Sequence, residues 1–106
     1  MKVFSIYMAT NTVNNKKYIG YDSAWPRRMK GHLTAAYSGR PAQYKQRFHA
    51  AIRKYGKENF TWEVLYQSLD CEHTLMCMEE YFIREHRTFC GFDDCNGYNL
   101  TLGGEG

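Results

Sequence analysis

Two short β-rich runs near the N-terminus constrain the fold more than any other part of the sequence. Residues 3–9 and 17–21 are rich in β-branched and aromatic side chains, and a polar, asparagine-rich segment joins them. Two such runs separated by a short turn segment predict an antiparallel hairpin. A chain of 106 residues that begins in this way has room for one domain built on a small sheet.

Helical periodicity follows the hairpin. We expect a first helix from Pro26 to about Tyr37, capped by Asp22 or Ser23, because these residue types commonly begin helices. A second helix over about 42–55 has apolar residues at helical spacing and ends at a glycine.

The second half of the chain completes the predicted fold. Residues 60–66 are dense in β-branched and aromatic side chains and predict a third strand, and 72–87 predict a third helix. The segment 88–106 holds five glycines and predicts irregular structure. The order β-β-α-α-β-α therefore predicts an α+β domain over residues 1–106, with a small three-stranded antiparallel β-sheet flanked by three helices.

Charge is unevenly distributed along the chain. Residues 16–57 contain eleven Lys or Arg and one acid, a net of +10, whereas residues 58–106 contain two Arg and ten acids, a net of −8. The first half therefore predicts a surface that binds a polyanion such as a nucleic-acid backbone. Solvated basic helix faces are the alternative.

Nothing in the sequence indicates membrane insertion or export. No apolar run approaches the roughly 18 residues that span a bilayer, and residues 1–10 lack the features of a signal peptide. We therefore expect a cytoplasmic, intracellular location, no membrane contact and reduced cysteines. A structural zinc site is the alternative for the cysteines and histidines of the last third, although their spacing matches no familiar zinc pattern: Cys71, His73, Cys77, His86, Cys90 and Cys95.

One acid of the predicted third helix occupies a core-facing position. Glu79 lies at the centre of an apolar stripe made by residues three or four positions away: Leu75, Met76, Phe82 and Ile83. Burial of an unpaired carboxylate costs several kcal/mol, so Glu79 needs a cation or strong hydrogen-bond donors. Metal ligation, catalysis and a structural pair with an arginine all stay open at this point. Its neighbour Glu80 lies beside Arg84 and predicts an ordinary exposed ion pair.

Two further pairs of polar side chains are candidates for the same site. Arg28 and His32 are four residues apart and share a face of the first helix, where Arg suits phosphate oxygens and His suits the proton of a water. Tyr7 and Tyr18 lie in the two strands of the hairpin, which brings them close together. Solvent exposure of Arg28 and His32, and simple aromatic packing of the tyrosines, are the ordinary alternatives.

Motifs along the whole chain resemble the GIY-YIG nuclease family, of the phage and intron-encoded homing type. The two defining tripeptides are matched by Ser5-Ile6-Tyr7, with Ser in place of Gly, and by Tyr18-Ile19-Gly20. The later motif residues of the family, in chain order, match Arg28, His32, Glu79 and the tripeptide Gly97-Tyr98-Asn99.

The resemblance implies an endonuclease that hydrolyses DNA phosphodiester bonds with one divalent cation, Mg²⁺ or Mn²⁺. It implies that Glu79 holds the metal and that Arg28 neutralises charge on the transition-state phosphate. Tyr7 would be the general base or a positioner for the attacking water, and Tyr18 and His32 would orient that water or relay its proton. The residues expected to contact DNA phosphate are Lys17, Arg27 and Lys30, while Asn99 is expected to fix either the substrate or the tail.

The same resemblance sets expectations about partners. We expect double-stranded DNA as the substrate and a monomer or weak dimer, because a single active site cuts one strand at a time. The irregular tail is expected to begin a linker to a separate DNA-recognition region. Two alternatives remain: a non-catalytic nucleic-acid-binding module and a small zinc-stabilised interaction domain.

Overall fold

The computed structural model describes residues 3–37 and 47–99. Three strands and two longer helices, with a third helical run that begins at α4, form an α+β fold and confirm the predicted class. In chain order the strands and α-helices are β1 (Phe4–Asn11), β2 (Lys17–Asp22), α1 (Arg27–Ala36), α3 (Arg47–Tyr55), β3 (Phe60–Ser68), α4 (Cys71–His73) and α5 (Glu79–His86). None of the helices formed by these residues is long and apolar enough to cross a membrane.

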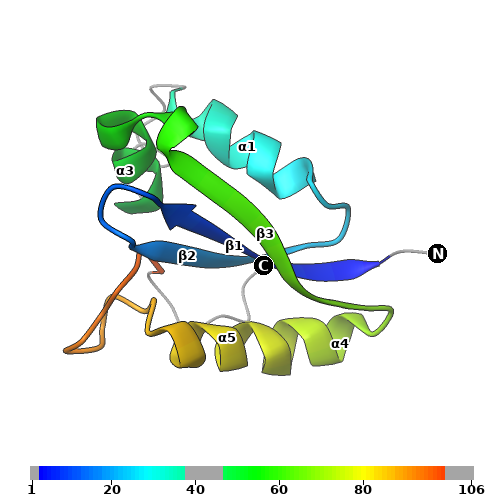
Figure 1. Cartoon of the computed structure of the whole chain (residues 1–106). Coiled ribbons are helices and arrows are strands. Elements are labelled where there is room, and N and C mark those ends of the chain that lie inside the picture. The colour runs from blue at the N-terminus through cyan, green and yellow to red at the C-terminus, as the bar shows by residue number, and fades with distance from the viewer. Residues whose placement is uncertain (1–2, 38–46, 100–106) are drawn as a thin grey trace.

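The sheet has the strand order β2-β1-β3, and both pairings are antiparallel. Helices cover both faces: α1 and α3 lie on one side, and the run from α4 to α5 lies on the other (Figure 1). Strand β1 is therefore enclosed on all sides, whereas β2 forms one edge of the sheet. This edge is where elements from both faces can approach the same strand.

Successive side chains of β1 point to opposite faces of the sheet and contribute to two separate hydrophobic clusters. Ile6 and Met8 pack with Ile83 of α5 on one face, and Ala9 packs with Phe48 of α3 on the other. Side chains on neighbouring positions of a strand point to opposite faces, so a strand buried on both sides needs apolar residues throughout. Burial of a side chain such as Ile83, which is fully buried, contributes about 2 kcal/mol.

The predicted hairpin forms, and asparagines shape its turn. The side-chain oxygen of Asn11 accepts a hydrogen bond from the backbone N–H of Val13 at 2.9 Å. The backbone N–H of Asn11 donates to the carbonyl of Lys16 at 2.8 Å. Asn15 adopts a left-handed backbone with φ of 63°, a region that asparagine tolerates better than most residues. These contacts fix the register of β1 against β2.

Of the two residues predicted to cap the first helix, Asp22 does so. Its carboxylate accepts hydrogen bonds from the N–H groups of Ala24 at 2.8 Å and Arg28 at 2.7 Å. Because Asp22 is also the last residue of β2, the cap ties the start of α1 directly to the edge strand. For the second predicted helix, the structure confirms the part that forms α3, and residues 42–46 lie outside the described residues.

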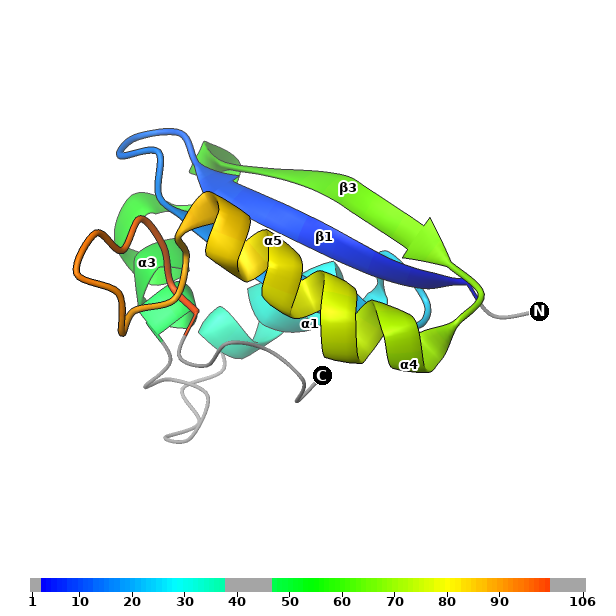
Figure 2. The same ribbon diagram turned by 90° about the horizontal axis from the view of Figure 1, so that it is seen from below.

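The third predicted helix contains an irregularity. The run from Cys71 to His86 is helical throughout, but Thr74–Met78 forms a π-helical turn directly before Glu79 (Figure 2). A π-turn shifts the angular phase of the helix, so the simple 100° spacing assumed from the sequence does not hold across it. Glu79 is nevertheless buried, at 5% exposure, as its place in the apolar stripe predicts. Glu80 and Arg84 form the expected exposed ion pair at 2.8 Å.

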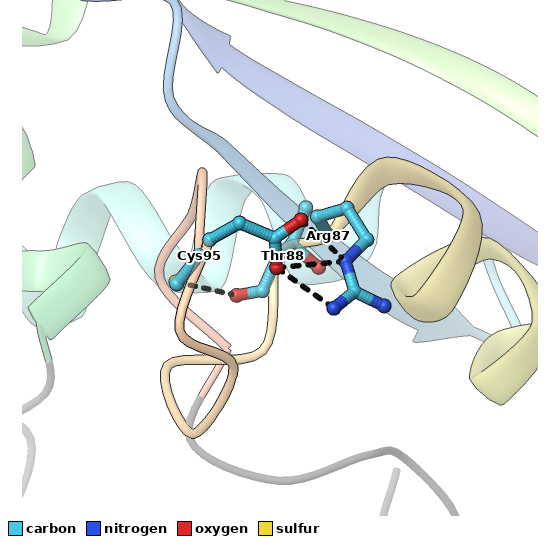
Figure 3. Close-up of polar contacts among 4 residues, drawn as sticks. Arg87, Thr88 and Cys95 are labelled. Carbon is cyan, nitrogen blue, oxygen red and sulfur yellow. Dashed lines mark hydrogen bonds and ion pairs between the residues drawn. The ribbon is translucent and has the colours of Figure 1, made fainter.

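Residues 88–99 are irregular, as predicted, and hydrogen-bonded to the rest of the fold, while residues 100–106 of the predicted irregular segment lie outside the described residues. Arg87 ends α5 in a left-handed conformation, and the Cys95 thiol donates to the carbonyl of Thr88 (Figure 3). Farther on, the backbone of Lys17 at the start of β2 accepts from Tyr98 at 2.9 Å and donates to Asn96 at 3.0 Å. The tail thus lies along the outer edge of β2.

Two glycine substitutions test this packing in opposite directions. A Cβ at Gly97 would overlap the carbonyl of Lys17 and the side chain of Thr88, whereas a Cβ at Gly31 on α1 meets nothing within 4 Å. We expect Gly97→Ala to lower the free energy of unfolding by about 1–3 kcal/mol through overpacking. We expect Gly31→Ala to raise it by about 1 kcal/mol through helix propensity. Urea unfolding measures both, and a neutral Gly97→Ala would contradict the tail contact.

Candidate active site

The hairpin brings two tyrosines together, as predicted. Tyr7 lies opposite Gly20 and Tyr18 lies opposite Ala9 in the β1–β2 register, so the two tyrosines are diagonal neighbours on one face. Their ring centroids are 6.4 Å apart. This face is the one covered by α1 and α3, since Tyr18 also stacks on Phe48 of α3 at 4.3 Å.

The glycine of the second tripeptide makes room for the first tyrosine. A Cβ at Gly20 would overlap the phenol carbon and hydroxyl of Tyr7. The Tyr7 ring therefore lies directly against the backbone of β2, and Trp25 stacks on it with a centroid distance of 5.0 Å. Tyr7 is fully buried as a result.

Two histidines extend the site from Tyr7. The Tyr7 hydroxyl lies 2.7 Å from Nε2 of His32 on α1, and Nδ1 of His32 lies 2.9 Å from Nε2 of His49 on α3. Burial, followed by the neighbouring His49 and Arg28, lowers the pKa of His32 to about 3. His32 is therefore neutral at physiological pH. Sequence reasoning missed His49, whose only signal was a polar residue beside Phe48 on the buried side of its helix.

Burial also raises the pKa values of Tyr7 and Tyr18. It raises the pKa of Tyr7 well above the ordinary value, and it raises that of Tyr18 to about 12 with a further contribution from Glu79. Arg28 acts in the opposite direction and lowers the pKa of both. Both hydroxyls are thus protonated at neutral pH. Both pKa values respond to Glu79 and Arg28, and that of Tyr7 is also raised by Tyr18 and Asp22.

Glu79 and Arg28 approach the tyrosine pair from different layers. Glu79 is in the first turn of α5, and Arg28 is in the first turn of α1 on the other side of the sheet (Figure 1). Both charges contribute to the pKa of Tyr18, which lies in the edge strand β2. Glu79 is buried and Arg28 is exposed.

The donor set suits a hard cation bound largely by water and substrate. Within residues 3–37 and 47–99, no three His, Cys, Asp or Glu side chains gather into a ready-made metal cage. The site does offer one buried carboxylate, Glu79, whose charge contributes to the raised pKa of both Tyr7 and Tyr18. Mg²⁺ is commonly held by one or two carboxylates, with waters and phosphate oxygens at its other positions. The residues present therefore fit such an ion.

The side chain of Asn99 is hydrogen-bonded to the backbone of the edge strand β2. Its side-chain oxygen accepts from the N–H of Ile19 at 2.9 Å, and its side-chain nitrogen donates to the carbonyl of Ile19 at 2.7 Å. Asn99 is buried at 5% exposure. Its amide thus extends the hydrogen bonding of β2 between Tyr18 and Gly20 and fixes the tail, one of the two roles expected for it.

The candidate phosphate-binding residues lie around this edge. Arg27 and Lys30 are exposed on the same helix as Arg28. Lys17 begins β2 next to Tyr18, and its ammonium group donates to the carbonyl and side-chain oxygens of Asn15 at 3.1 Å each. Arg27 and Lys30 are thus open to solvent, and Lys17 is half-buried.

The cysteines occupy separate surroundings. Cys71 contacts the hydroxyl of Tyr21 at 3.3 Å, Cys77 is exposed, and Cys90 and Cys95 each donate to the carbonyl of Gly97 at 3.4 Å. The described residues do not bring three potential zinc ligands together. The zinc alternative therefore has no arrangement of ligands to support it in this part of the chain.

Comparison with known proteins gives concordant results. The family model described as the GIY-YIG catalytic domain matches residues 3–99. The candidate endonucleases segB and segE of Enterobacteria phage T4 are 36% identical over 100 residues and 33% identical over 101 residues. These matches cover 94% and 95% of this chain but 38% and 42% of the relatives, so the chain spans about two fifths of their length.

Two solved structures share the fold. The catalytic domain of the homing endonuclease I-TevI superposes with a TM-score of 0.74 at 24% identity, covering 92% of this chain and 98% of that one. A mutant form of the same domain, described as belonging to an intron endonuclease, gives a TM-score of 0.72 at 24% identity and covers 95% of both chains.

The lowered pKa of His32 predicts a specific acid sensitivity. The unfolded chain binds a proton at His32 more readily than the folded chain does, so the stability that neutral His32 allows is present above pH 6.5 and is lost as the pH falls toward about 3. Between pH 7.5 and pH 5.0 the loss is about 2 kcal/mol. Urea unfolding at both pH values measures it.

The matched variants are His32→Gln and His73→Gln, the second at an exposed position on α4. We expect the difference in stability between the two pH values to shrink in His32→Gln and to keep its wild-type size in His73→Gln. Equal behaviour of the two variants would contradict the buried, neutral state of His32.

Proposed function

The chain belongs to the GIY-YIG nuclease family, and from this premise we propose that it is an endonuclease that hydrolyses phosphodiester bonds of double-stranded DNA with one divalent cation. The observation that carries the proposal is the adjacent pair Tyr7 and Tyr18, whose pKa values respond both to the buried carboxylate of Glu79 and to the guanidinium of Arg28. A hydrolase for a charged diester needs such a combination of a metal ligand, a cation and polar hydroxyls.

Glu79 is the residue that would hold the cation, which we propose to be Mg²⁺ or Mn²⁺. When bound, the ion supplies Lewis-acid chemistry that polarises the phosphate and stabilises the leaving 3′ oxygen. Burial favours this role for Glu79 over its neighbour, since Glu80 is engaged by Arg84 at the surface.

Arg28 would stabilise the negative charge that develops on the phosphate in the transition state. Its backbone N–H is held by the buried carboxylate of Asp22, so the position of the residue at the start of α1 is fixed before substrate binds. A guanidinium carried on a fixed backbone position can form charge-assisted hydrogen bonds to the oxygens of a bound phosphate.

The hydroxyls would position and deprotonate the attacking water. Tyr7 is the proposed base or positioner, with Tyr18 and His32 orienting the water or relaying its proton. Because burial disfavours the Tyr7 phenolate, Tyr7 can accept a proton only if its own proton moves on at the same time. Nε2 of His32, 2.7 Å away, is placed to receive it.

Lys17, Arg27 and Lys30 are the proposed contacts to the DNA backbone. Asn99 is proposed to support this DNA-binding surface indirectly, because its side chain is hydrogen-bonded to the backbone of β2 at Ile19. We propose that the protein acts in the cytoplasm, as a monomer or weak dimer. Since the chain spans about two fifths of its T4 relatives, we also propose that sequence recognition requires a further region.

Two substitutions test the proposed metal ligand and the proposed stabiliser of the transition state. Supercoiled plasmid incubated with the protein at low salt should be nicked in Mg²⁺ and left intact in EDTA. We expect Glu79→Gln to lose at least about 100-fold in nicking rate, and Arg28→Ala to lose about as much, since each removes a charge that acts in the transition state. Conversion of supercoiled to open-circular plasmid measures the rate.

Glu80→Gln is the control, because it changes the adjacent residue of the same helix in the same way. It should nick at the wild-type rate, and circular dichroism should show all variants folded. DNA binding without Mg²⁺-dependent nicking by the wild type, unchanged in Glu79→Gln, would favour a non-catalytic binding module.

The proposed contacts to DNA phosphates predict a salt dependence of DNA binding that becomes weaker with each basic residue removed. Affinity for a short duplex should fall steeply with salt, because each neutralised phosphate releases counterions. We expect Arg27→Ala and Lys30→Ala each to lower the slope of log affinity against log salt by about 1. Fluorescence anisotropy measures the slope, and Lys54→Ala on α3 is the control. Equal slopes for all proteins would contradict phosphate contacts on α1.

A further inference from the structure

Three side chains from three elements form one continuous hydrogen-bonded row. Tyr7 of β1 contacts Nε2 of His32 on α1 at 2.7 Å, and Nδ1 of His32 contacts Nε2 of His49 on α3 at 2.9 Å. His49 is 3% exposed. The function proposed above assigns no role to His49.

The two contacts of His32 must have opposite directions. A neutral imidazole carries one N–H donor and one bare nitrogen acceptor, and burial keeps His32 neutral. If Nδ1 of His32 donates to His49, Nε2 must accept from Tyr7. If His49 donates to Nδ1, Nε2 must instead donate to Tyr7. The direction of both hydrogen bonds therefore depends on whether Nε2 of His49 carries a hydrogen.

The burial of Tyr7 selects between the two directions. In the described part of the chain, the hydrogen bond to His32 is the one that Tyr7 makes through its hydroxyl. If Tyr7 only accepted there, its own hydroxyl proton would be buried without an acceptor, an arrangement that proteins avoid. Donation from Tyr7 to His32, and from His32 to His49, gives the Tyr7 hydroxyl proton an acceptor and uses both nitrogens of His32.

We propose that His49 is a positioning residue that holds His32 in the Nδ1–H tautomer, so that Nε2 of His32 accepts the hydroxyl proton of Tyr7. The inference rests on the proposed function, because it explains how a buried tyrosine can serve hydrolysis. In this proposal His49 acts on the reaction only through His32. It acts by accepting one hydrogen bond through its Nε2 atom.

The direction of the row can be measured without DNA. Long-range ¹H–¹⁵N NMR spectra of the ¹⁵N-histidine-labelled protein report which ring nitrogen carries the hydrogen, and His32→Gln identifies the signals of His32. We expect the Nδ1–H tautomer of His32 in the wild type. We expect a shift toward the Nε2–H tautomer in His49→Phe, which offers no acceptor, and retention of Nδ1–H in His49→Gln, whose amide oxygen can accept.

Nicking assays then connect the tautomer to function. We expect His49→Phe to reduce the maximal nicking rate by about ten- to a hundredfold with unchanged DNA affinity, because only proton movement is affected. His49→Gln should stay within about threefold of the wild type. Ile52→Val on the same buried face of α3 is the control for lost packing, and it should keep both the tautomer and the rate.

The outcomes separate this inference from the proposed function. An Nε2–H tautomer of His32 in the wild type would overturn the inference, even if no variant of His49 folds. An equal loss of rate in His49→Phe and His49→Gln with the Nδ1–H tautomer intact would also overturn it. A wild-type protein that shows the Nδ1–H tautomer but never cuts DNA would instead refute the proposed function and uphold the direction of the row.

Discussion

The register between β1 and β2 is the constraint on which the rest of the site depends. Tyr7 stands opposite Gly20, and the absence of a side chain at Gly20 leaves the space that the Tyr7 ring fills. A slip of one residue would turn Tyr7 to the other face of the sheet and separate it from His32. The register is set at the turn by the Asn11 contacts, and the Asn99 amide holds the outer side of β2 at Ile19. Residues far from the chemistry thus determine where the hydroxyls lie.

The edge position of β2 gives the site its charge pattern. An interior strand would keep the helices of the two faces apart, whereas an edge lets Glu79 of α5 and Arg28 of α1 act on the same tyrosines. The carboxylate is buried beside protonated phenols, and the guanidinium is exposed where a phosphate can reach it. We propose that a cation and a phosphate bind together at this edge, because a bound metal ion favours both a carboxylate ligand and phosphate oxygens.

The sequence predicted the parts that depend on local pattern. Strand alternation, helix periodicity and turn residues set the order of elements, and the apolar stripe around Glu79 correctly indicated a buried acid. Contacts between distant segments were beyond that reasoning. The Asn99–Ile19 pairing joins residues 80 positions apart, the His32–His49 contact depends on how two helices pack, and the π-turn before Glu79 has no periodic signal. The family motifs supplied some of these residues, but not His49, which became visible only through its hydrogen bond.

The central claim is that Glu79 binds a divalent cation beside the tyrosine pair. Its most direct test is paramagnetic broadening of backbone amide signals by substoichiometric Mn²⁺, which requires neither DNA nor turnover. The account predicts broadening centred on Glu79 and Tyr18 in the wild type and in Glu80→Gln, and its loss in Glu79→Gln. Broadening that survives in Glu79→Gln, or that centres on the exposed acids Asp93 and Asp94, would contradict the account.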